Sequence, residues 1–193
     1  RSDSSAASDV YKRQLQEFSK SNKIKSLGLC DTSNLCGALE FAEKISKSGT
    51  QPIIGTQINF KIHDTVGLLP LYALNEIGYK NIIHLSSVSY LKNDELSDPH
   101  VTFDYLLNNS EGIALFSGTV FGLFGQLFDK GKFTEIHDLY NKIKLKFGDR
   151  FYIEIQRHND LNENGFEKFN LKKSSDLAVS YTHLTLPTSL IVW

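Results

Sequence analysis

The chain has 193 residues, 40% of them hydrophobic, and its 21 basic and 22 acidic side chains leave a formal net charge of −1 at pH 7. This length and composition are typical of one globular domain and exclude a disordered chain. No stretch approaches the roughly 18 consecutive apolar residues of a membrane helix, and the near-zero net charge excludes a domain that grips nucleic-acid phosphates through an overall basic field.

The cysteine and methionine contents indicate the compartment and the completeness of the chain. Cys30 and Cys36 are too few for a disulfide scaffold or a complete zinc site, so we expect a reduced, cytoplasmic protein. The sequence contains no methionine, not even at its start, and we interpret it as a fragment.

Both ends of the chain differ from its middle. Residues 1–14 carry no apolar periodicity, and residues 178–193 contain no Asp, Glu, Lys or Arg. The strings DVYKRQ and VSYTHLTLPT within them resemble translated sequencing-adapter read-through. We predict that both ends are non-native and that residues 15–177 are the authentic segment; the alternative is a disordered arm and a genuine C-terminal strand.

Helical and extended patterns alternate along the middle of the chain. Helices are expected over residues 15–22, 34–48, 75–91, 102–107, 121–128, 132–147 and 166–177, and strands over 26–30, 52–60, 68–73, 112–117 and 151–156. Short, continuous apolar strands are typical of a parallel sheet covered by helices. The predicted fold class is therefore α/β, more barrel-like than open, with its first and last strands missing.

Capping and stop residues place several helix ends. Asn34 is expected to cap the first long helix, and Gly49 to end it. Asn75 opens the helix that ends near Leu91, and Thr102 caps the short helix after it. The apolar face expected for the first long helix consists of Leu35, Ala38, Leu39, Ala42 and Ile45.

Three polar residues are assigned to the carboxyl ends of predicted strands, where parallel α/β folds collect their functional groups. Asp31 follows SLGLC, Gln57 ends PIIGTQ, and His158 follows FYIEIQ. An Asp and a His at one barrel mouth could ligate a divalent metal or share a proton. Two alternatives remain open: Asp31 as a turn residue before a helix N-terminus, and His158 as a solvated loop residue.

Other site motifs are absent from the sequence. There is no Walker A loop, no Gly-x-Gly-x-x-Gly after a strand and no Gly-x-Ser-x-Gly elbow. Cys30 is interpreted as a buried small hydrophobe rather than a nucleophile. The remaining histidines outside the ends are expected to have surface or packing roles: His63, His84, His100 and His137.

Several spaced segments resemble the amino-terminal PHP domain of bacterial DNA polymerase III alpha subunits. They are LGLCDTSNLCGALEFAEKISKSGTQPIIGTQ, LYALNEIGYKNIIHLSS, PHVTFDYL, EGIALFSG and FYIEIQRH. The resemblance covers nearly all of residues 15–177. It implies a distorted (β/α) barrel of the PHP type, incomplete here, related to metal-dependent phosphoesterases.

The resemblance also implies which residues would hold metal. Intact members bind a metal cluster through a His-x-His pair, an Asp-His step, a Glu, further histidines and a late Asp-x-His. Here Asp31 and His158 match ligand positions, whereas Thr32, Gln57 and Leu68 replace a His, the Glu and a His. We therefore expect Asp31 and His158 to be vestigial metal ligands, with no cofactor bound by this segment.

The expected function follows from the resemblance. The parent protein would be the replicative DNA-directed DNA polymerase, using Mg²⁺ held by palm carboxylates that this chain does not contain. The PHP segment would be inactive, stabilise the polymerase and help to dock the proofreading exonuclease among the polymerase III subunits, with DNA contacted through the parent. The alternative is a metal-dependent PHP phosphoesterase or 3′–5′ exonuclease.

Overall fold

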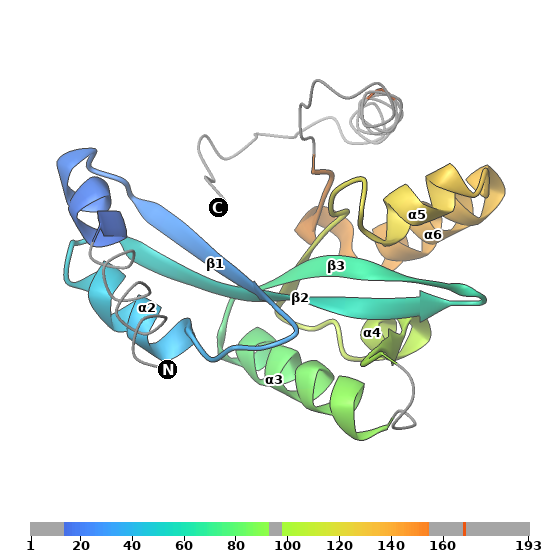
Figure 1. Ribbon diagram of the computed structural model, residues 1–193, viewed down its shortest axis with the longest axis horizontal. Helices are drawn as coiled ribbons and strands as arrows, with labels where there is room; N and C mark the ends of the chain where they lie inside the picture. The colour runs from blue at the N-terminus through green and yellow to red at the C-terminus, as the bar shows by residue number, and fades with distance from the viewer. Residues whose placement is uncertain (1–13, 93–97, 155–167, 169–193) are drawn as a thin grey trace.

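The computed structural model describes residues 14–92, 98–154 and 168 (Figure 1). Residues 14–21 form a helix, close to the predicted range of 15–22. The helix predicted over 166–177 lies outside the described residues except for Lys168.

Six strands among the described residues form one mixed sheet. Their bounds are β1 (Ser26–Thr32), β2 (Gln51–Ile62), β3 (Thr65–Ala73), β4 (Val101–Thr102), β5 (Ile113–Phe116) and β6 (Phe151–Tyr152). The order is β1-β2-β3-β5-β6, and β4 pairs with β2. The pairs β1/β2, β2/β4 and β5/β6 are parallel, whereas β2/β3 and β3/β5 are antiparallel.

The α/β class is confirmed, but the prediction of a parallel sheet is wrong. β2 ends later and β3 begins earlier than predicted. Ile62 pairs with Thr65, so that only His63 and Asp64 connect the two strands. A two-residue connection can join only antiparallel strands, because a parallel pair needs a crossover of a dozen residues or more. His63 takes a positive φ of 49° to close this hairpin.

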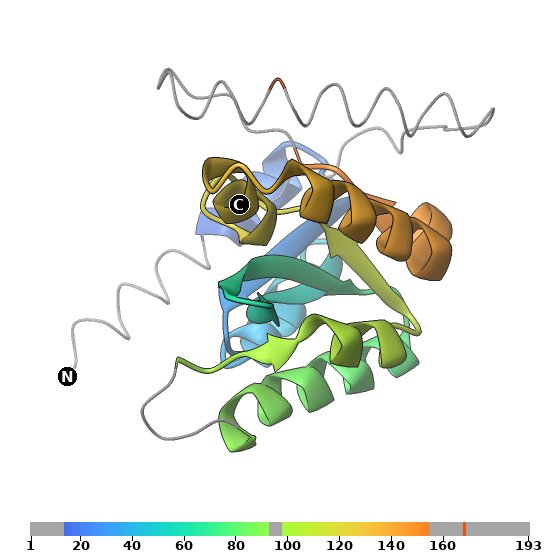
Figure 2. The ribbon, with the colours of Figure 1, turned by 90° about the vertical axis from the view of Figure 1, so that its right-hand side faces the viewer.

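Helices lie on both sides of the sheet (Figure 2). They are α2 (Ala38–Ser46), α3 (Glu76–Leu91), α4 (Phe103–Asn108), α5 (Leu123–Asp129) and α6 (Phe133–Phe147), followed by the 3₁₀ turn η1 (Gly148–Arg150). In Figure 2, α3 and α4 lie below the strands while α5 and α6 lie above them.

Two groups of buried apolar side chains hold these layers together. A large cluster joins β2, β3, β4 and β5 to helices α3–α6 and includes Phe60, Phe124 and Phe147. A small cluster of Leu27, Phe41 and Ile45 joins β1 to α2. The large cluster is the main source of hydrophobic stabilisation, because that term scales with buried apolar area.

Helix α2 differs from its prediction in both start and face. It begins at Ala38 rather than near Asn34. The Asn34 side chain instead forms a local turn, accepting a hydrogen bond from the Cys36 N–H at 3.0 Å and donating to the Thr32 carbonyl at 2.9 Å. Phe41 is buried where Leu39 was expected, and Leu39 is 73% exposed.

The start of α3 agrees with its prediction. Asn75 precedes the helix, and its Oδ1 accepts a hydrogen bond from the Gly78 N–H at 2.9 Å. Gly78 has a second constraint, because a Cβ there would lie 1.8 Å from the Gly112 carbonyl oxygen. The Asn-Glu-x-Gly segment therefore combines a helix cap with a close helix–strand approach.

Candidate functional site

The predicted polar site lies where β1 ends against the middle of β2. Register places Asp31 opposite Thr56 and Thr32 opposite Gln57. The expectation that Gln57 ends its own strand is wrong, because β2 continues to Ile62 in the hairpin. β1 does end here: Ser33 has a φ of 58° and donates its N–H to the Gln57 carbonyl at 2.8 Å.

Thr32 and Gln57 contact each other directly. The Gln57 Nε2 donates a hydrogen bond to the Thr32 Oγ1 at 2.6 Å. Both side chains are uncharged. The bond uses one donor of the Gln57 amide and an acceptor position of the Thr32 hydroxyl. The pair therefore joins the ends of β1 and β2 as an ordinary cross-strand contact.

Asp31 points away from this pair. Successive side chains of a strand point to opposite faces, and Asp31 lies on the α2 side, with its Oδ2 3.0 Å from where a Cβ of Gly37 would be. Gly37 directly precedes α2. A carboxylate there is favoured by the positive end of the helix dipole. The interpretation of Asp31 as a turn residue before a helix N-terminus requires this position.

The other predicted positions do not join this group. Leu68 lies in β3 opposite Asn59, while Gln57 faces Pro70. His158 lies outside the described residues. Within residues 14–92, 98–154 and 168, no group of three or more His, Cys, Asp or Glu side chains could hold a metal ion.

Cys30 lies on the Thr32 face of β1, beneath a buried tyrosine. The Tyr72 ring passes over Gly55, where a Cβ would meet its Cδ1 at 2.5 Å. Burial raises the pKa of the Cys30 thiol to about 11, opposed by its hydrogen bond with Tyr72. Burial also raises the pKa of Tyr72. The thiol is therefore protonated near neutral pH and unsuited to nucleophilic attack.

An aromatic row continues from Tyr72 across the sheet. The Tyr72 and Phe116 rings meet edge to face at 5.0 Å, and Phe116 stacks on Tyr152 at 5.1 Å. Local patterns did not predict this row, although its three aromatic residues lie near the ends of predicted strands, because their contacts depend on how β3, β5 and β6 pair.

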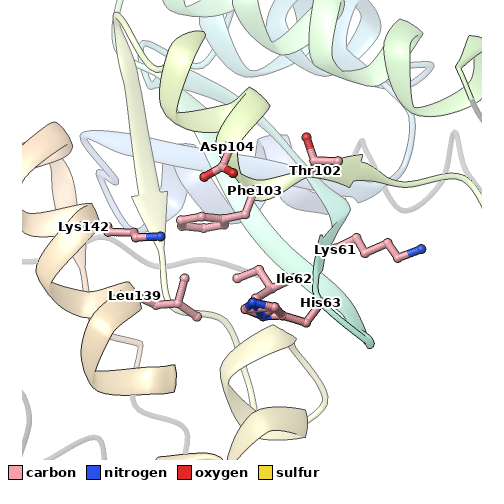
Figure 3. A pocket seen from close by; sticks show the side chains of 8 residues that line it. All are labelled: Lys61, Ile62, His63, Thr102, Phe103, Asp104, Leu139 and Lys142. Carbon is pink, nitrogen blue, oxygen red and sulfur yellow. The ribbon is translucent and has the colours of Figure 1, made fainter. Parts of the chain in front are cut away.

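A cleft lies between β2, α4 and α6 (Figure 3). Its volume is about 330 Å³, and Ile62, Phe103 and Leu139 supply its apolar lining. Lys142 and Asp104 border it, while the Lys61 side chain points outward. Sequence reasoning missed this cleft because its walls come from three segments far apart in the chain.

The mixed α/β sheet, the Asn75-capped start of α3 and the polar end of β1 are the features to compare with known proteins. The model of the family described as "PHP domain" matches residues 1–158. The chain belongs to the PHP domain family, and the PHP-type α/β fold expected from the sequence is confirmed.

The matching curated relatives are DNA polymerase III alpha subunits. That of Caulobacter vibrioides is 37% identical over 158 residues, covering 75% of this chain, and that of Rickettsia felis is 34% identical over 164 residues, covering 84%. The chain spans 13% and 14% of their lengths. The resemblance to the PHP region of these proteins is confirmed.

The structural comparison is weaker. A Bifidobacterium adolescentis protein, provisionally described as a metal-dependent phosphoesterase, has 18% sequence identity and a TM-score of 0.30, covering 62% of this chain and 45% of its own. Among the described helices, none combines the length and apolar character needed to cross a membrane.

Proposed function

We propose that this chain is the PHP segment of a replicative DNA polymerase III alpha subunit and that the segment is catalytically inactive. Its role is to stabilise the polymerase and to help dock the proofreading exonuclease subunit. The parent would carry out DNA-directed DNA synthesis with Mg²⁺ in the cytoplasm. Its membership of the PHP family and its polymerase relatives support the parent.

The direct pairing of Thr32 with Gln57 carries the proposal of inactivity. Where active relatives are expected to present a His and a Glu, this chain has a hydroxyl and an amide hydrogen-bonded to each other at 2.6 Å. Catalytic metal ions are held by carboxylates and imidazoles, which offset the charge and dehydration of the cation. Two neutral, mutually satisfied groups supply neither anionic charge nor an imidazole.

The position of Asp31 adds to this argument. Its carboxylate approaches Gly37 on the α2 side of the sheet, whereas Thr32 and Gln57 share the other face. The structural interpretation of Asp31, as a carboxylate before a helix, accounts for its placement without a metal.

Metal content and nuclease activity test the inactivity. The full chain, loaded with Zn²⁺ or Mn²⁺ and then desalted, is expected to retain substoichiometric metal and to leave a 3′-labelled single-stranded DNA intact. Asp31→Ala should change neither result, and Asp149→Ala, in the exposed η1 turn, is the matched control. Stoichiometric metal with nuclease activity that Asp31→Ala abolishes would establish the phosphoesterase or exonuclease alternative instead.

A variant with restored metal-ligating side chains extends the same experiment. The double variant Thr32→His with Gln57→Glu returns an imidazole and a carboxylate to positions that already lie opposite each other. It is expected to retain more Zn²⁺ than the unmodified chain under the same protocol. Equal retention by the two proteins would show that these positions are not the reason for weak metal binding.

The docking role needs a separate measurement. Isothermal titration of the chain with the proofreading exonuclease subunit of a bacterial DNA polymerase III is expected to give saturable heat. The same titration with the double variant Thr32→His/Gln57→Glu should give the same affinity, because the proposed docking role does not require a metal site at these two positions. If the exonuclease subunit bound neither the unmodified chain nor the double variant, the docking role would be contradicted.

A further inference from the structure

We draw no further inference here: the strongest candidate, the exposed apolar surface that Ile83, Tyr90 and Leu91 form along the outer side of α3, carries no proposal because nothing in the structure shows what covers it.

Discussion

The β1–α2 unit and the rest of the domain differ in how they are anchored. The small cluster under α2 contains Leu27, Phe41 and Ile45, supported by half-buried neighbours. The large cluster connects four strands to four helices among the described residues. Asp31 and Thr32 thus lie on the less deeply anchored unit, which we expect to open locally at lower free energy than the remainder.

The largest expected effect comes from the large cluster. Phe124 is fully buried and stacks on Tyr140 with ring centroids 4.7 Å apart. Phe124→Ala should lower the free energy of unfolding by about 4 kcal/mol, because it removes apolar burial and leaves a cavity. Urea unfolding followed by circular dichroism measures this change. A loss below about 1 kcal/mol would contradict the central role of this cluster.

Truncation in the small cluster should have a smaller and more local effect. Phe41 is 3% exposed, and we expect Phe41→Ala to cost about 3 kcal/mol, the lower end for buried Phe truncations. Hydrogen exchange should show protection lost in β1 and α2 while α6 keeps it. Leu39→Ala, on the same helix but 73% exposed, should change stability by less than about 0.5 kcal/mol. Equal loss of protection in α6 would show that the domain unfolds as one unit.

Helix caps allow a finer comparison. Asn75→Ala removes the hydrogen bond from Gly78 and should lower the free energy of unfolding by about 1 kcal/mol. Thr102 occupies the same place before α4 but makes no side-chain capping bond there. Thr102→Ala should therefore cost less than Asn75→Ala in the same urea experiment, and the reverse order would contradict the capping geometry.

The smallest effect concerns the reactivity of Cys30. In a Cys36→Ser chain, iodoacetamide should modify Cys30 slowly at pH 7 and faster as pH rises toward its raised pKa of about 11, because only the thiolate reacts. Adding Phe41→Ala should accelerate the modification by opening the β1–α2 unit. Adding Leu39→Ala instead should leave the rate of Cys30 modification unchanged. Fast modification in the unaltered fold at pH 7 would contradict the raised pKa of this half-buried thiol.

Locally coded features could be predicted from the sequence. Asn75 before an apolar helical pattern marked the start of α3, because a cap depends on residues three positions apart. The strand at Ile113–Phe116 was evident from a compact apolar run. The spaced family motifs indicated the PHP family, which the family match confirms.

Predictions that depended on distant partners were less accurate. The start of α2 was misplaced because Asn34 makes a turn of its own, and Leu39 and Phe41 are equally apolar candidates for the buried face. Which of the two is buried depends on where β1 lies. Likewise, β3 runs antiparallel to β2 because the two strands continue to a two-residue turn. Local sequence patterns did not mark this turn.

For the candidate site, the sequence by itself determined which chemical groups are available: Asp31, Thr32 and Gln57 in place of a full ligand set. Only the tertiary structure decided that Thr32 and Gln57 bond to each other while Asp31 points toward α2. It also brought Ile62, Phe103 and Leu139 to one cleft. The physical reason is that side-chain chemistry is set residue by residue, whereas proximity and facing are set by strand register and helix packing across the whole fold.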